Sequence, residues 1–146
     1  MKKNLMLICV ASIVAVIDQI TKSLIRANFE VNQTTPVINN FLHITYITNT
    51  GTAFGLFKGI NFVFILFSIL VIFGIFYSSR KIKESQSLMI FSLGLLLGGT
   101  VGNLIDRIVY GFVIDFIDFK IWPVFNIADS AVTVSVAFLI VILWRE

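Results

Sequence analysis

The most informative part of the sequence is "LMIFSLGLLLGGTVGNLIDRIVYGFVIDFIDF", residues 88–119. Its first part, residues 88–105, carries no charged side chain and is long enough to cross a bilayer core of about 30 Å as a helix. The rest of the stretch carries three aspartates and one arginine among apolar residues. Because carboxylates are costly near hydrocarbon, this pattern predicts a membrane-spanning helix followed by a polar segment at one membrane face.

The composition of the whole chain agrees with a membrane protein. Of its 146 residues, 58% are hydrophobic and only 13% are charged, whereas a soluble domain has about 25% charged residues. Three more apolar stretches of spanning length cover residues 4–25, 60–77 and 125–144. We therefore expect a membrane all-α fold, a four-transmembrane-helix bundle that forms one domain over residues 1–146, with no room for a second folded unit.

Basic residues near the ends of these stretches predict the orientation. One side of the expected bundle carries Lys2, Lys3, Arg80, Lys81, Lys83 and Arg145. Lysine and arginine are enriched in cytoplasmic loops, so both chain termini should be cytoplasmic. The two longer loops, residues 26–59 and 106–124, should then face outward.

This topology brings five aspartates to the outer membrane face. They are Asp18, Asp106, Asp115, Asp118 and Asp129. Asp106 ends the third expected helix and Asp129 begins the fourth, while Asp115 and Asp118 are expected in the loop that joins them. For Asp118 the plainer interpretation is a solvated acid.

Several neighbouring residues are expected to support this cluster. Asp18 and Lys22 are four residues apart with the acid first, which is the favourable order for an ion pair on a helix. Small residues and one acid form a stripe at a spacing of four: Gly94, Gly98, Gly102 and Asp106. Such a stripe allows close helix packing and would hold Asn103 and Asp106 against a neighbouring helix.

The outer loop before the second span contains two further motifs. The alternation and β-branched residues of "FLHITYIT", residues 41–48, predict a short strand. "NTGTAFGLF", residues 49–57, is either a turn that brings backbone close to a ligand or a simple re-entry into the second helix. His43, the single histidine, has no cysteine or histidine companion with which to form a zinc site.

Five motifs together resemble a known family. "DQITK", "NTGTAFG", "GGTVGNLIDR", "VIDF" and "FNIADSA" are similar, in order and spacing, to the motif set of the lipoprotein signal peptidase family, also called signal peptidase II or prolipoprotein signal peptidase. Each motif is weak alone. The match runs from residue 18 to residue 131, so it covers nearly the whole chain.

The resemblance implies a membrane aspartic endopeptidase of the bacterial cytoplasmic (inner) membrane. Such an enzyme removes the signal peptide from a diacylated prolipoprotein and cuts before the lipid-modified cysteine, at the outer membrane–water interface. Its catalytic pair falls on Asp115 and Asp129. Its substrate-binding residues fall on Asn49, Gly51, Asn103, Arg107 and Asn126, and its supporting residues on Asp18, Lys22 and Asp106.

The same resemblance implies further properties. A small extracytoplasmic β-sheet cradle and a loop should lie above the site, with "FLHITYIT" supplying part of the cradle. No cofactor and no metal are expected to take part. The expected partners are a diacylated prolipoprotein, membrane lipid and the cyclic peptide inhibitor globomycin, with no nucleic acid, and the protein is expected to be a monomer.

The residues alone leave two questions open. Chemistry does not choose between Asp115 and Asp106 as the partner of Asp129, although the neighbouring Arg107 should favour a permanently charged, structural Asp106. A competing function class is a small four-helix transporter or channel, which predicts ionisable residues deep along a path between the spans. A purely structural membrane protein would not need the aspartate cluster.

Overall fold

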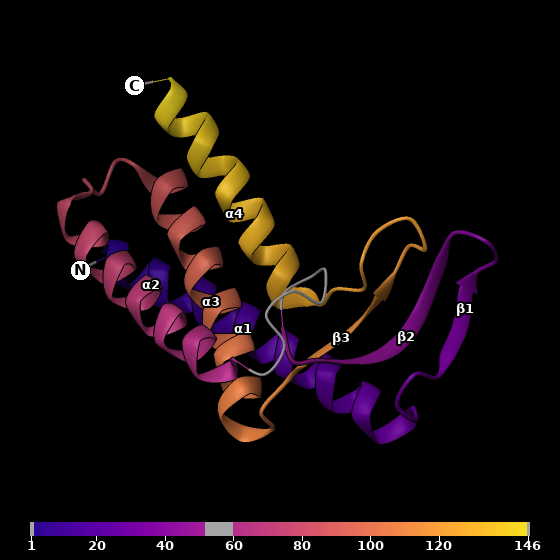
Figure 1. The fold of residues 1–146 in the computed structure, drawn as a ribbon. Helices are drawn as coiled ribbons and strands as arrows, with labels where there is room; N and C mark the ends of the chain where they lie inside the picture. Colours follow the sequence, from indigo (N-terminus) through magenta and orange to yellow (C-terminus); the bar gives the residue numbers. More distant parts are fainter. Residues whose placement is uncertain (1, 52–59, 146) are drawn as a thin grey trace.

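Four long helices dominate the structure, a computed structural model that describes residues 2–51 and 60–145 (Figure 1). The helices are α1 (Lys2–Asn28), α2 (Asn61–Lys81), α3 (Ser87–Val109) and α4 (Ile127–Trp144). All four are long and apolar enough to cross a membrane. The predicted membrane all-α fold is therefore confirmed.

The outward surface of the helices is apolar. Leu24 of α1 is 58% exposed, and Phe67 and Phe73 of α2 are 64% and 69% exposed. Apolar surface of this extent is unfavourable in water but is solvated by lipid chains. The chain is thus a multi-pass membrane protein.

Helix α3 is the central element, because α1, α2 and α4 all pack against it. Gly94 and Gly98 bring α3 against the backbone of α1, where Ala11 and Val14 face Gly98. The side chain of Ser135 on α4 donates a hydrogen bond of 2.7 Å to the backbone oxygen of Ser92. The predicted packing role of the glycine stripe is confirmed.

This close approach gives a prediction about stability. In a Gly98→Ala variant the new Cβ would lie 2.6 Å from the carbonyl oxygen of Ala11, so α1 must move away from α3. We expect the free energy of unfolding in detergent to fall by about 1–3 kcal/mol. Gly74→Ala is the matched control, because its new Cβ would meet no atom of the described residues within 4 Å apart from its own turn of helix. Equal stability of the two variants would contradict the packing described.

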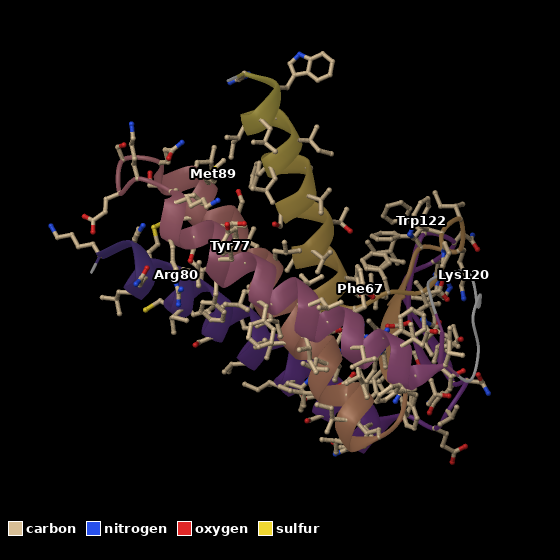
Figure 2. All side chains as sticks on the ribbon, turned by 60° about the vertical axis from the view of Figure 1, so that its left-hand side comes forward. Phe67, Tyr77, Arg80, Met89, Lys120 and Trp122 are labelled. Atoms are coloured by element: carbon tan, nitrogen blue, oxygen red, sulfur yellow. The ribbon has the colours of Figure 1, made fainter. Side chains whose placement is uncertain are left out.

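Basic residues gather at one end of the bundle. The Nζ of Lys3, near the start of α1, donates hydrogen bonds to the backbone oxygens of Ser79 (3.0 Å) and Ile82 (2.7 Å) at the end of α2. Figure 2 shows Arg80 at the end of the helices away from Lys120 and Trp122. The carbonyls at a helix C-terminus favour a cation, so these residues also stabilise the end of α2.

A small antiparallel sheet lies at the end of the bundle away from both chain termini (Figure 1). Its strands are β1 (Thr34–Ile38), β2 (Leu42–Asn49) and β3 (Val113–Asp118), in the order β1-β2-β3. The strand predicted over residues 41–48 is β2. The expected β-sheet cradle is confirmed, and it has three strands in the described part of the chain.

The expected position of two acids was wrong. Asp115 and Asp118 lie on β3 and not in a loop, because residues 113–118 pair along β2. Asp118 is buried, with a hydrogen bond of 2.6 Å from Thr45 Oγ1 and an ion pair of 2.6 Å with Lys120. Burial alone would raise the pKa of Asp118, but the hydrogen bonds from Lys120 and Thr45 outweigh it and lower the pKa. Asp118 is a structural acid of the sheet and is not solvated.

Candidate active site

Two aspartates line one small pocket where the sheet meets the helices. Asp115 comes from β3 and Asp129 from the first turn of α4. The pocket has a volume of about 150 Å³ and is lined by Asn49, Gly51, Asn103, Arg107, Val113, Asp115, Val124 and Asp129. All but two of these residues were predicted for the site. Val113 and Val124 were missed, since an apolar side chain carries no chemical signal in a sequence this apolar.

Asp115 is buried and held by two asparagines. The Nδ2 of Asn49 donates to Asp115 Oδ2 at 2.8 Å, and the Nδ2 of Asn126 donates to Asp115 Oδ1 at 2.7 Å. Burial penalises the charged carboxylate, and the charge of Asp129 penalises it further. These two effects raise the pKa of Asp115 to about 7, despite the opposing hydrogen bonds. Asp115 therefore keeps its proton over much of the acidic range.

Asp129 is fixed by the start of its own helix. Asn126 is the N-cap of α4, and its side chain accepts a hydrogen bond of 2.8 Å from the backbone N–H of Asp129. In return, the backbone N–H of Asn126 points to Asp129 Oδ2 at 3.4 Å. This reciprocal capping box explains why "FNIAD" begins a helix. Asn126 thus contacts both aspartates and sets their relative position.

Asn103 of α3 supplies the other contact to Asp129. Its Nδ2 donates to Asp129 Oδ1 at 2.7 Å, and its Oδ1 accepts a hydrogen bond of 2.9 Å from the Nζ of Lys22. All four carboxylate oxygens of Asp115 and Asp129 consequently accept an N–H group. Such donors hold the two acids in place without adding charge.

Three supporting residues form a buried ion cluster behind the pocket. Lys22 Nζ lies 2.8 Å from Asp18 Oδ2 and 2.9 Å from Asp106 Oδ2. The predicted Asp18–Lys22 ion pair is confirmed. Asp18 Oδ1 also accepts from the backbone N–H of Ala128, and Asp106 Oδ2 accepts from that of Ile114. The cluster therefore ties α1 and α3 to the two segments that carry the catalytic candidates.

Two details of this cluster differ from the sequence interpretation. The ion partner of Asp106 is Lys22 and not its neighbour Arg107, because successive side chains of a helix point in different directions. Gln19 was overlooked, yet its Nε2 donates to Asp106 Oδ1 at 2.9 Å and to the backbone oxygen of Gly102 at 3.1 Å. Its position inside the "DQITK" motif was the available signal.

Arg107 and the segment after β2 complete the pocket. The guanidinium of Arg107 lies 5.1 Å from the ring centre of Phe64 and faces the charges of Asp115 and Asp129. The backbone N–H of Gly51 donates to Asn49 Oδ1 at 3.0 Å. The remainder of the "NTGTAFGLF" motif, from residue 52 onward, lies outside the described residues, so the choice between a turn and a helix start stays a prediction.

A larger apolar groove adjoins the pocket on the α4 side. It has a volume of about 580 Å³, and Asp129 lies on its wall. The other lining residues are Phe119, Trp122, Phe125, Ser130, Val132, Thr133 and Val134. The groove connects the outer surface of α4 with one member of the aspartate pair.

Comparison with known proteins identifies the family. The family model described as signal peptidase (SPase) II matches residues 10–145. A lipoprotein signal peptidase of Desulfitobacterium hafniense is 47% identical over 135 residues, which cover 92% of this chain and 89% of that protein. The lipoprotein signal peptidase of Halothermothrix orenii is 41% identical over 141 residues, 97% of each chain.

Two solved structures have the same fold. Both are described as bacterial membrane enzyme structures obtained by the in meso method, at 2.3 Å and 1.9 Å resolution. Each is 35% identical to this chain, with TM-scores of 0.91 and 0.88. They cover 95% and 96% of this chain, and 87% and 93% of their own chains are matched. This chain belongs to the signal peptidase II family.

Proposed function

We propose that this protein removes the signal peptide from diacylated prolipoproteins, with Asp115 and Asp129 as the catalytic pair, and cuts before the lipid-modified cysteine. One observation carries the proposal: the buried carboxylate of Asp115 and the half-buried carboxylate of Asp129 meet in one small pocket where the sheet joins the apolar helices. Family membership favours this function over a small transporter or channel.

The chemistry follows from the unequal surroundings of the two acids. Asp115 is buried, whereas Asp129 is half-buried and faces the charge of Lys22, so Asp129 keeps its charge more readily. Asp129 therefore acts as the base and takes a proton from a water molecule. The water oxygen then bonds to the scissile carbonyl carbon, while protonated Asp115 donates its proton to the carbonyl oxygen. When this tetrahedral intermediate collapses, the C–N bond breaks. The proton held by Asp129 passes to the leaving nitrogen, and one hydroxyl group of the intermediate returns its proton to Asp115 as the C=O bond forms again.

The pocket and the groove bind different parts of the substrate. The residues proposed to bind the peptide backbone and the lipid ester are Asn49, Gly51, Asn103, Arg107 and Asn126, which lie in the pocket or contact its aspartates. The adjoining apolar groove is large enough for an acyl chain and reaches the outer surface of α4. A diacylated cysteine would thereby place its own peptide bond beside Asp129. Asp18, Lys22 and Asp106 support this arrangement.

We further propose the placement of the molecule in the cell. Residues 1–146 form a single peptidase domain in the bacterial inner membrane, and the protein works as a monomer. Both termini are cytoplasmic and the pocket faces outward, because the basic residues gather at the end away from the sheet. Globomycin should compete with the prolipoprotein for the pocket, and no nucleic acid takes part.

Cysteine labelling tests this orientation. In a Cys9→Ser background, Lys83→Cys and Gln33→Cys each place one thiol at an exposed position. Because Gln33 lies beside the sheet, its cysteine should react with an impermeant thiol reagent in intact cells. The cysteine at position 83 should react only after lysis. The opposite labelling pattern would place the pocket on the cytoplasmic side.

The raised pKa of Asp115 predicts two pH effects. The cleavage rate should fall as the pH rises through about 7, since Asp115 then loses the proton that it must donate. The stability of the fold should also decrease as the pH rises. Between the unfolded pKa near 4 and the folded value near 7, the folded protein binds more protons than the unfolded chain, so its free energy of unfolding should decrease with pH. An Asp115→Asn variant should lose this slope in urea or SDS unfolding, and an unchanged slope would reject a protonated Asp115.

A direct assay tests the function itself. Purified protein in detergent is incubated with one prolipoprotein in its diacylated form and, separately, in its unmodified form. We expect release of the signal peptide from the diacylated form, with a product that begins at the lipid-modified cysteine by mass spectrometry. Equal cleavage of the unmodified form would show that the enzyme does not recognise the lipid of its substrate.

A further inference from the structure

The ammonium group of Lys22 is buried at the centre of the molecule, where the side chain is 2% exposed. Its three N–H donors have three acceptors: Asp18 Oδ2 at 2.8 Å, Asp106 Oδ2 at 2.9 Å and Asn103 Oδ1 at 2.9 Å. The first two acceptors explain an ion cluster. The third acceptor is a neutral amide oxygen, and its residue, Asn103, also donates a hydrogen bond to Asp129.

Lys22 determines which way the amide of Asn103 points. An ammonium group can only donate hydrogen bonds, so the carbonyl oxygen of Asn103 must face it. The NH₂ group then faces the opposite way, and it donates to Asp129 Oδ1 at 2.7 Å. In the reversed amide an NH₂ group would face the ammonium, and an oxygen would face the carboxylate. Both hydrogen bonds would be lost.

Asn126 favours the same orientation of the Asn103 amide. The Nδ2 of Asn126 points to Asn103 Oδ1 at 3.2 Å while it also donates to Asp115 at 2.7 Å. The charges that face Asp129 are those of Lys22 and Asp18 on α1, Arg107 on α3 and Asp115 on β3. Among these charged residues, within the described part of the chain, only Lys22 donates to the side chain of Asn103, whereas Arg107 points to its backbone oxygen at 3.4 Å.

We propose that Lys22 is a positioning residue for catalysis: by fixing the amide of Asn103, it keeps an N–H donor on Asp129 and thereby holds that carboxylate ready as the base. This inference rests on the proposed function. It assigns to Lys22 a role beyond the ion cluster, one that acts through Asn103 and that should alter the chemical step.

A double-mutant cycle in single-turnover cleavage tests the proposal. The four proteins are wild type, Lys22→Met, Asn103→Leu and the double variant, with saturating diacylated prolipoprotein. Lys22→Met should lower the cleavage rate constant about 10- to 100-fold, the effect of one hydrogen bond to a charged group, and leave KM nearly unchanged. In the Asn103→Leu background, Lys22→Met should lower the cleavage rate constant by less than about threefold, because the amide that Lys22 positions is absent.

Gln19→Met is the matched control. Gln19 donates to Asp106 and Asp18 in the same cluster but leaves the contact between Lys22 and Asn103 in place. It should reduce thermal stability and change the cleavage rate constant by less than about threefold.

The outcomes separate the two roles of Lys22. Two results would overturn the proposal and leave Lys22 as a residue that only stabilises the bundle. In the first, the loss of cleavage rate in the double variant equals the product of the losses in Lys22→Met and Asn103→Leu. In the second, Gln19→Met lowers the cleavage rate as much as Lys22→Met does. Loss of Lys22 leaves the buried carboxylates of Asp18 and Asp106 without their ion partner. If Lys22→Met does not fold for this reason, the cycle is repeated in an Asp106→Asn background, which removes one of these two charges. Absence of cleavage by the wild type would instead overturn the proposed function.

Discussion

Asp115→Asn and Asp129→Asn should each lower the rate of prolipoprotein cleavage by roughly 10⁴-fold or more and leave the fold intact. An amide is nearly isosteric with a carboxyl group, so each variant keeps the shape of the pocket. Neither variant can perform its share of proton transfer: an amide at position 115 has no acidic proton to donate, and an amide at position 129 cannot accept a proton from water. Both rates are measured under single-turnover conditions with saturating substrate.

The double variant and one control make this prediction specific. Because the two acids are proposed to act in one step, the double variant should be little slower than either single variant. Asp118→Asn is the matched control, since Asp118 lies on the same strand but bonds to Thr45 and Lys120 outside the pocket. It should keep more than about a tenth of the activity. Retained turnover in Asp115→Asn would exclude Asp115 and make Asp106 the next candidate.

Asn126→Asp should have the second largest effect, a loss of about 100-fold or more in cleavage rate. The new carboxylate can still accept the hydrogen bond from the backbone N–H of Asp129, so the helix cap is kept. It can no longer donate to Asp115 Oδ1, and it adds a third acid where Asn126 now contacts both members of the pair. Adjacent carboxylates compete for protons, which disturbs the division of roles between Asp115 and Asp129.

Asn61→Asp provides the same change of charge at the first residue of α2. Asn61 donates to the backbone oxygen of Arg107 and does not line the pocket. Its variant should stay within about threefold of the wild-type rate. If Asn126→Asp is as active as Asn61→Asp, then Asn126 does not arrange the aspartate pair.

The helices and their close packing were predictable because their signals are local. Apolar length identifies a spanning helix, and the spacing of Gly94, Gly98 and Gly102 identifies the contact face of α3. The Asp18–Lys22 pair also depends only on helical spacing. These features need no knowledge of distant parts of the chain.

The arrangement of the acids was less predictable because it depends on long-range pairing. Asp115 and Asp118 occupy a strand only because residues 113–118 pair with β2, far away in the sequence. The ion partner of Asp106 is Lys22 across a helix interface, whereas its sequence neighbour Arg107 stacks on Phe64. Residue chemistry alone therefore left Asp115 and Asp106 as open alternatives, and the family resemblance made the choice.

The proposed mechanism requires that Asp115 is protonated while Asp129 is charged. Infrared difference spectroscopy of purified protein with isotope-labelled aspartate, followed over pH, measures that proton as a carboxylic acid C=O band. We predict that the wild type shows one protonated aspartate near pH 6, that the band disappears as the pH rises through about 7, and that it is absent from Asp115→Asn. A wild-type spectrum in which every aspartate is already ionised at pH 6 would exclude a protonated Asp115 as the catalytic acid.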